Sequence, residues 1–275
     1  MLRAAGRGFR GLAELAFPLV FPDECRVCGE ALREVSRIPV CARCLCDPQP
    51  LSAEFFCVAC RTPFLNHFPL DESDRCPLCR LGLTGFDAAY SYGSYEGSLR
   101  KLIHLFKYDK IYTLARPLAD FLARVLPREE RFDAVVPMPL HWRRRWERGF
   151  NQSELLVREI AKKWNVPLQR SVRRLKSTAP QAGLTNAKRR VNVAGAFAVK
   201  KNIRLDGARV LLVDDVLTTG ATAAACARAL KRAGAAHVAL LALARTDRRV
   251  ALSSFEMTPE GNANAAAAAW AGGIT

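Results

Sequence analysis

Apolar residues from position 86 onward follow two periods, one typical of buried strands and the other typical of amphipathic helices. Continuous apolar runs predict strands at 132–136, 194–199, 210–213 and 238–244. Apolar residues three and four positions apart predict helices at 99–106, 114–126, 151–164 and 221–233. Buried strands that alternate with helices predict an α/β protein in which a doubly wound, mainly parallel sheet is covered on both faces.

Two local signals refine this pattern. Three tyrosines recur at positions 90, 92 and 95 in an extended stretch with Gly93 near its centre, which predicts a short hairpin. Asn151 and Glu154 stand at the N-cap and N3 positions of the helix expected there, which is typical of a capping box with Asn in place of Ser or Thr. The first signal therefore places a strand pair before the first predicted helix, and the second indicates where the third helix starts.

Residues 25–79 are dominated by cysteine. Nine of the ten cysteines lie there, and eight of them form four C-x-x-C pairs: Cys25/Cys28, Cys41/Cys44, Cys57/Cys60 and Cys76/Cys79. Two thiolates three positions apart can sit on one tight turn, and two such turns complete the tetrahedral sulfur shell that zinc accepts. A segment of about sixty residues buries little surface without such a staple. We therefore expect two structural zinc ions rather than disulfides, redox chemistry or a catalytic zinc, which needs an open position.

The sequence leaves the pairing of these turns open. Consecutive pairing would give two tandem zinc ribbons, with gaps of 12 and 15 residues inside the two halves, whereas interleaved pairing would give a cross-brace. Cys46 and His67 are interpreted as surface residues, and Cys226 as a small buried side chain in a helix. Two glycines between 81 and 85 predict a boundary, with a module at 1–84, a domain at 85–250 and an Ala-rich tail at 251–275.

The stretch from Val210 to Thr222 combines a buried strand, two adjacent carboxylates and a hydroxyl-rich loop that opens a helix. Ligands of doubly wound sheets collect where strands end and helices begin. The helix start offers N–H donors and a positive dipole end to a phosphate, and Gly220 allows close backbone approach. Asp214 and Asp215 are suited to accept hydrogen bonds from sugar hydroxyls beside that phosphate. The string therefore predicts a ribose 5-phosphate site rather than an ordinary capped turn.

This string resembles the phosphoribosyl pyrophosphate (PRPP) signature of the type I phosphoribosyltransferases. The resemblance implies a doubly wound sheet of that type, with Asp214 and Asp215 as catalytic residues that bind the ribose hydroxyls. It implies that the 5-phosphate is bound by Val216, Leu217, Thr218, Thr219, Gly220, Ala221 and Thr222. It also implies Mg²⁺ bound with PRPP, a mobile cover at about 176–190, and a pyrophosphate loop formed by Met138, Pro139 and Leu140.

The wider chain is similar to the ComF family, bacterial proteins linked to DNA-uptake competence. Beside the cysteine ribbon, the similarity is carried by the motifs Gly97-x-Leu99-Arg100, Phe106-Lys107-Tyr108, Val136-Pro-Met-Pro139, Arg148-Gly-Phe-Asn-Gln152, Ser177-Thr178 with Gln181 and Leu184, and Arg190-x-Asn192. It implies a small N-terminal double zinc-ribbon module joined to a phosphoribosyltransferase domain. A role in DNA uptake and a DNA-uptake helicase as partner are further expectations.

Charge is concentrated in one part of the chain. Residues 141–205 hold 17 Lys+Arg and 3 Asp+Glu, so that 14 of the 16 net positive charges lie there. Such a segment faces solvent anions such as pyrophosphate, or a polyanion. Aromatic residues at 142, 146 and 150 are interleaved there with Arg143, Arg144, Arg145 and Arg148. This mixture is typical of single-stranded DNA binding, although the aromatic side chains could instead pack on the sheet while the arginines are solvated.

Two functions remain open at this point. In the first, the protein is a Mg²⁺-dependent transferase that moves ribose 5-phosphate from PRPP to an unknown nucleophile and releases pyrophosphate. In the second, it is a non-catalytic protein that senses PRPP or a nucleotide while its basic surface holds single-stranded DNA. Because no apolar run approaches the roughly 20 residues that span a bilayer, and the first 22 residues read as an amphipathic start rather than a signal peptide, we expect a cytoplasmic location.

Overall fold

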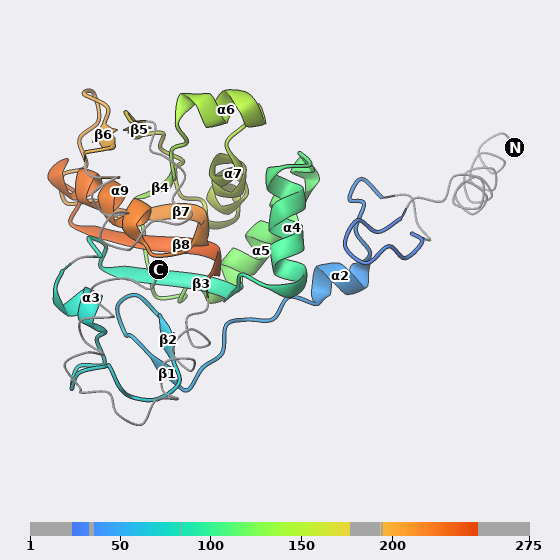
Figure 1. Ribbon diagram of the computed structural model, residues 1–275. Coiled ribbons are helices and arrows are strands. Elements are labelled where there is room, and N and C mark those ends of the chain that lie inside the picture. The colour runs from blue at the N-terminus through green and yellow to red at the C-terminus, as the bar shows by residue number, and fades with distance from the viewer. Residues whose placement is uncertain (1–23, 33–35, 83, 177–192, 194, 247–275) are drawn as a thin grey trace, which may run out of the picture.

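A computed structural model describes residues 24–32, 36–82, 84–176, 193 and 195–246 (Figure 1). At its centre lies a four-stranded parallel sheet with the strand order β3-β8-β7-β4. The strands are β3 (Ala88–Ser94), β4 (Ala134–Pro137), β7 (Arg209–Leu217) and β8 (His237–Arg245). β4, β7 and β8 are buried along nearly their whole length, as parallel strands with two covered faces should be. The predicted α/β class and parallel sheet are therefore confirmed.

Four helices connect these strands. They are α4 (Gly97–Lys107), α5 (Ala115–Val125), α7 (Gln152–Trp164) and α9 (Ala221–Arg232). A single 3₁₀ turn, η1 (Tyr112–Leu114), precedes α5. Each helix agrees with its range predicted from apolar spacing to within about two residues at either end, which is the usual uncertainty of helix boundaries.

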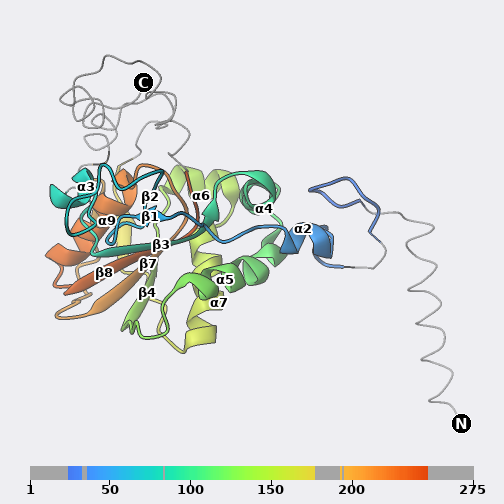
Figure 2. The same cartoon turned by 90° about the horizontal axis from the view of Figure 1, so that it is seen from below.

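The helices cover the sheet on both faces (Figures 1 and 2). α5 and α7 lie on one face, where Leu156 of α7 shares a core with Leu211 and Val213 of β7. α9 lies on the other face, where Leu230 shares a second core with Leu212. Alternate residues of β7 therefore face different helices, which explains why the strand reads as a continuous apolar run instead of an alternating one.

The predicted hairpin around Gly93 is wrong. β3 is one uninterrupted strand that pairs in parallel with β8, and Gly93 stands opposite Ala244. The glycine is required for another reason: a Cβ there would lie 2.7 Å from the carbonyl oxygen of Gln49. Gln49 belongs to a segment that runs along the edge of β3, where the N–H of Leu51 donates to the carbonyl of Tyr92 (2.6 Å). Gly93 thus marks a close backbone approach rather than a turn.

The predicted N-cap of α7 is confirmed, but the predicted capping box is not. The side-chain oxygen of Asn151, the N-cap, accepts a hydrogen bond from the N–H of Ser153 (3.1 Å). Glu154 does not complete a capping box with it. Its carboxylate instead binds the guanidinium groups of Arg158 (2.8 Å) and Arg170 (2.6 Å), because two arginines offer charge-assisted bonds that a backbone N–H cannot match.

The cysteine-rich segment forms two small modules. The first contains α2 (Ala42–Cys46) and packs on α4, where the ammonium of Lys101 donates to the carbonyl of Val27 (3.1 Å) (Figure 1). The second contains the antiparallel strands β1 (Phe55–Phe56) and β2 (Pro63–Phe64) and the short helix α3 (Pro77–Arg80). It lies along β3, where the N–H of Ala89 donates to the carbonyl of Ala59 (2.9 Å). The first module therefore packs on α4, and the second packs along β3 of the parallel sheet.

Further short elements lie beyond the carboxyl end of β4. They are the helix α6 (Trp142–Arg148) and the antiparallel strands β5 (Val172–Arg174) and β6 (Phe197–Val199). β6 is shorter than the strand predicted at 194–199. The cover predicted at 176–190 lies, except for Lys176, outside the described residues, as does the tail at 251–275. Among the helices that the structure describes, none is both long and apolar enough to cross a membrane.

Candidate functional site

The carboxyl ends of β4 and β7 lie side by side, and β7 carries the two acidic residues that the sequence singled out (Figure 1). After β7, a three-residue loop leads to α9, which begins at Ala221. Gly220 is the N-cap of α9 with a φ of 78°, a left-handed conformation that favours glycine. The hydroxyl of Thr219 accepts a hydrogen bond from the N–H of Ala221 (3.4 Å). The strand, the loop and the helix start therefore occur in the order that the predicted phosphate site needs.

The other residues of the predicted phosphate loop differ in exposure. Val216 and Leu217 belong to β7, which extends beyond the predicted end at Val213, and not to the loop; Leu217 is buried, and Val216 is half-buried against the core below α5 and α7. Thr218 is exposed, and Thr222 is half-buried in the first turn of α9. Side-chain recognition of an anion at this loop would thus fall to the threonines, because Leu217 and Val216 face the protein interior.

The residues predicted to bind pyrophosphate follow β4 and lie beside β7. Met138 is buried, and its N–H donates to the carbonyl of Val213 (2.8 Å) while its carbonyl accepts from the side-chain amide of Asn151 (3.1 Å). Pro139 is also buried, whereas Leu140 is half-buried. The structure therefore brings this turn next to the acidic pair, and Leu140 is the residue of the three with the most accessible surface.

Asp215 is buried and both of its carboxylate oxygens are engaged. The ammonium of Lys107, at the end of α4, lies 2.7 Å from Oδ1, and the side chains of this pair are 12 and 8% exposed. The side-chain amide of Gln152, at the start of α7, donates to Oδ2 (2.5 Å). Burial opposes the charge of Lys107, yet the coulombic attraction of Asp215 and a hydrogen bond to it raise the pKa of this ammonium. Three elements therefore converge on one ion pair under the site.

Asp214 has a different environment. It is half-buried, and its Oδ1 accepts hydrogen bonds from the N–H of Asp215 (2.9 Å) and from the hydroxyl of Ser153 (3.4 Å). Burial of its carboxyl, together with the charge of Asp215, raises the pKa of Asp214 to about 7, although Lys107 and the two hydrogen bonds act in the opposite direction. Of the two adjacent acids, Asp214 is therefore the one that has accessible surface, and the fold disfavours its ionised form.

This raised pKa predicts a stability cost that grows with pH. The folded pKa lies above the usual value of about 3.9, so the stability that protonated Asp214 contributes is lost as the pH rises from about 4 through 7. We expect Asp214→Asn to raise the melting temperature by about 2–4 °C more at pH 8 than at pH 6. Thermal unfolding at the two pH values measures this difference. Asp120→Asn, which alters an exposed ion pair with Lys163, is the control and should show no such increase.

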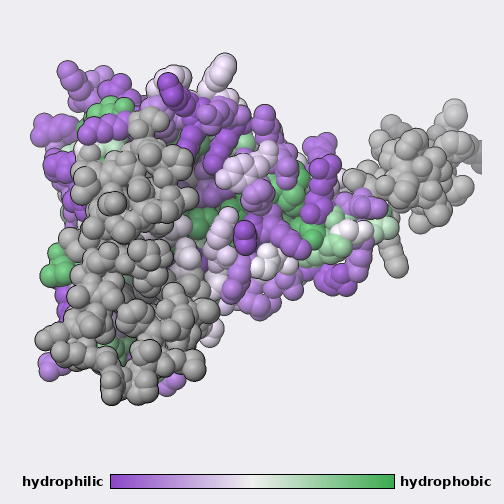
Figure 3. Space-filling view, in the orientation of Figure 1, coloured by the Kyte–Doolittle hydropathy of each residue, from purple (hydrophilic) through white to green (hydrophobic). Residues whose placement is uncertain are grey.

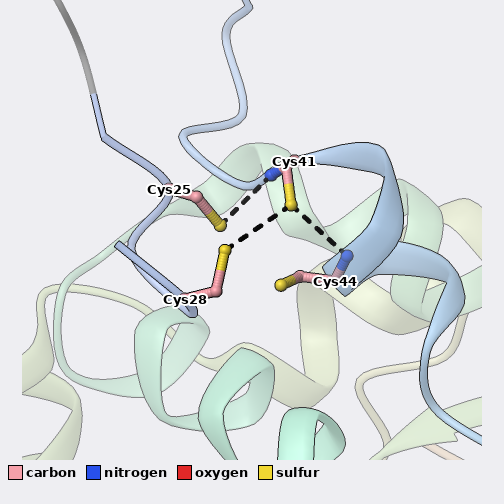
Figure 4. Close-up of side chains that lie close together, drawn as sticks. All are labelled: Cys25, Cys28, Cys41 and Cys44. Atoms are coloured by element: carbon pink, nitrogen blue, oxygen red, sulfur yellow. Dashed lines mark hydrogen bonds between the residues drawn. The ribbon is translucent and has the colours of Figure 1, made fainter. Parts of the chain in front are cut away.

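The eight cysteines of the C-x-x-C pairs form two separate tetrads, and within each the sulfur atoms all lie within 4.8 Å of one another. Figure 4 shows the first tetrad. The structure shows the consecutive pairing of the turns that the sequence had left open. The distance between Cys28 and Cys41 sulfurs is 3.8 Å, and that between Cys60 and Cys76 sulfurs is 3.7 Å. Zinc–sulfur bonds of about 2.3 Å in a tetrahedron place the sulfurs about 3.8 Å apart, so both tetrads fit zinc.

The environment of the tetrads also resembles that of metal-bound thiolates. The N–H of Cys41 donates to the sulfur of Cys25, and the N–H of Cys76 donates to the sulfur of Cys57, both at 3.3 Å. The cysteines outside the tetrads behave as predicted: Cys46 is exposed and Cys226 is buried in α9. His67 is also exposed, with its ring nitrogen 3.2 Å from Asp74.

The arginine-rich segment forms α6, which the sequence analysis did not predict. Its two tryptophans, Trp142 and Trp146, are 64 and 85% exposed, so the alternative in which they pack against the sheet is wrong. The guanidinium of Arg143 lies over the ring of Trp142 (5.4 Å), and that of Arg148 lies over the exposed ring of Tyr108 (5.1 Å). Arg144 and Arg145 lie on the same short helix, where hydrophilic side chains crowd the upper edge of the molecule (Figure 3). The third aromatic residue, Phe150, packs inward instead, with its ring 6.0 Å from Phe106.

The parallel sheet and the strand–loop–helix element define a phosphoribosyltransferase-type domain beside two cysteine modules. The family model described as a phosphoribosyl transferase domain matches residues 150–258. A PRPP amidotransferase from B. subtilis, seen in a complex with ADP and GMP, is similar in structure, with 18% identity and a TM-score of 0.33 over 47% of this chain and 26% of that one.

Curated relatives extend over both parts of the chain. The competence protein F of Haemophilus influenzae is 34% identical over 182 residues, which cover 63% of this chain and 79% of that protein. The DNA utilization protein YhgH of Salmonella typhimurium is 31% identical over 240 residues, which cover 83% of this chain and 99% of that protein. The chain belongs to the ComF family, as its motifs led us to expect.

Proposed function

We propose that the protein binds PRPP at the carboxyl end of β7 and, with Mg²⁺, transfers its ribose 5-phosphate to a nucleophile with release of pyrophosphate. The observation that carries the proposal is the arrangement of Asp214 beside a glycine-capped loop at the start of α9. The Asp214 carboxylate and the start of α9 suit the two ends of the sugar. A half-buried carboxylate accepts hydrogen bonds from the diol, and the helix start attracts the 5-phosphate.

In the proposed reaction the bond between the anomeric carbon and pyrophosphate breaks, and a bond to the nucleophile forms as the nucleophile loses its proton to water. The sugar gains positive charge on the way, which the negative charge of Asp214 would stabilise, while Leu140 would lie near the leaving group. Oxygen donors such as the Asp214 carboxylate suit Mg²⁺. When bound with PRPP, this ion would neutralise the charge that builds up on pyrophosphate.

PRPP with Mg²⁺ should raise the melting temperature of the wild-type protein by about 5 °C or more at a PRPP concentration of about 100 Kd, because a ligand that binds only the folded state stabilises it. Asp214→Asn should lose this shift, since the amide no longer accepts hydrogen bonds as an ionised carboxylate does. The double variant Asp214→Asn/Asp215→Asn should lose it as well. Differential scanning fluorimetry with and without PRPP measures the shifts.

Asp120→Asn provides the matched control and should keep the full shift, because Asp120 pairs with Lys163 on the outer surface of α5. A wild-type protein that PRPP does not stabilise would contradict the proposed pocket. The transfer step is tested separately, by release of pyrophosphate in the presence of a panel of amines and bases. Binding without release would favour a sensor over a transferase.

A second function is favoured by the exposed aromatic residues of α6. We propose that Arg143, Arg144, Arg145 and Arg148 contact the phosphates of single-stranded DNA while Trp142 and Trp146 stack on its bases. The two tryptophans lie one helical turn apart, and each is more than half exposed. Exposure of these apolar rings to water is unfavourable in the free protein, and their flat faces can stack on bases. The two proposals use different residues, although α6 begins only two residues after Leu140, so the two ligands would lie near each other.

Replacing both Trp142 and Trp146 with alanine should weaken binding of a fluorescent oligonucleotide at least tenfold, since one base stack is worth about 1–3 kcal/mol. Replacing Arg143, Arg144 and Arg145 with alanine should also weaken binding and should lower its salt dependence. Fluorescence anisotropy at several salt concentrations measures both effects. Arg128→Ala/Arg131→Ala, at the opposite end of the sheet, is the control. Equal losses in the control and the α6 variants would show that overall charge, not α6, binds DNA.

A further inference from the structure

The last residue of β8 connects the sheet to the second cysteine module. Arg245 is 4% exposed, and its guanidinium donates to the carbonyl of Cys60 (2.6 Å) and to the hydroxyl of Thr62 (2.8 Å). The hydroxyl of Thr62 in turn lies 2.9 Å from the sulfur of Cys60, one of the four sulfurs of the second tetrad. A buried charge on a strand of the central sheet thus binds the turn that presents a metal ligand.

The same end of β8 also holds the beginning of the phosphate loop. Leu217, the last residue of β7, stands opposite Arg245 in the sheet register. The next N–H of the chain, that of Thr246, donates to the carbonyl of Leu217 (3.0 Å). Since Thr218 follows Leu217 directly, the loop leaves the sheet beside Arg245.

A second contact reaches the other end of the loop. Phe86 is buried in the core that contains Cys57 and Cys60 of the second tetrad. Its ring lies 3.9 Å from the position that a Cβ of Gly220 would occupy, so it is close to the backbone there. Arg245 therefore lies beside the start of the loop and Phe86 beside its end, and Arg245 is the one that binds the second cysteine module directly.

We infer that Arg245 is a positioning residue that braces the phosphate loop against the second cysteine module, and that PRPP affinity depends on this brace. The expected effect of Arg245 on PRPP affinity rests on the proposed function, whereas its expected effect on the loop does not. A guanidinium with two acceptors in fixed directions orients the chain end more strongly than a single bond could. Anion sites built from backbone N–H groups need such fixed positions.

Arg245→Gln should weaken PRPP binding at least tenfold in calorimetric titrations of the full chain. In the ligand-free protein it should also speed up hydrogen exchange of the amides at 217–222, while the metal content per chain stays at the wild-type value. Arg209→Gln is the matched control, because Arg209 binds Glu130 (2.5 Å) at the opposite end of the neighbouring strand. It should lower the melting temperature but leave exchange at 217–222 and PRPP affinity within twofold of wild type.

Thr62→Val removes one acceptor of Arg245 with little change in volume, so it decides the question if Arg245→Gln does not fold. It should speed up exchange at 217–222 in the same direction but less, and Arg245→Lys should fall between wild type and Arg245→Gln. Wild-type exchange at 217–222 in both Arg245→Gln and Thr62→Val would overturn the inference. Failure of the wild-type protein to bind PRPP would overturn the proposed function instead, because the exchange experiment does not use the ligand.

Discussion

Replacing Lys107 with methionine should lower the free energy of unfolding by about 3–5 kcal/mol, one of the largest effects expected of a single substitution in this chain. Methionine fills much the same volume, so packing changes little. The loss arises because Asp215 then remains buried without the ammonium that now lies 2.7 Å from its Oδ1. The hydrogen bond from the Gln152 side-chain amide alone cannot compensate for the full buried charge of Asp215. Chemical denaturation of the two proteins measures the difference.

A double-mutant cycle separates the contribution of the ion pair to stability from that of side-chain packing. Lys107→Met/Asp215→Leu removes both charges and should regain much of the stability that Lys107→Met loses, because a buried pair replaced by apolar groups is often neutral. Lys163→Met is the matched control, since it breaks an exposed pair with Asp120 at a similar distance (2.8 Å) and should cost less than about 1 kcal/mol. If Lys107→Met cost no more than Lys163→Met, Asp215 would not depend on its partner.

The sequence was sufficient to predict the strand–loop–helix element that carries Asp214. Every part of it is adjacent in the chain: an apolar strand that carries two acids, a loop and a helix capped by a glycine. Local patterns determine such elements because each residue's conformation depends mainly on its neighbours. The cysteine tetrads could be predicted for the same reason, although only the fold decided that consecutive turns pair.

Contacts between distant segments could not be predicted in this way. Lys107 belongs to one of the motifs that the sequence contains. A lysine at the end of a helix is also stabilised by the helix dipole, so its presence at the end of α4 did not by itself indicate an ion pair with Asp215. The same is true of Arg245, whose partners lie in the cysteine module. α6 was missed for another reason. None of its seven residues is buried, so it has no apolar period to detect.

Loss of the second metal site should destabilise the protein more than loss of the first. Cys57 is fully buried and the other three cysteines of its tetrad are buried too, whereas Cys28 of the first tetrad is exposed. We therefore expect Cys57→Ser to lower the melting temperature by about 10 °C or more, and Cys28→Ser by less than half of that. Zinc contributes several kcal/mol to the folding of such modules, and both modules share a core with strands of the sheet, so the expected difference rests on the deeper burial of the second tetrad.

Metal analysis of the purified variants gives the expected stoichiometry: two zinc ions per chain in the wild-type protein and one in each serine variant. Cys46→Ser is the control, because Cys46 is exposed and outside both tetrads, and it should keep both ions and the wild-type melting temperature. A chelator should remove the first ion before the second, since burial of all four sulfurs slows access to the second site. Equal melting temperatures for Cys28→Ser and Cys57→Ser would contradict the unequal roles of the two modules, because the deeper burial of the second tetrad would then add no stability.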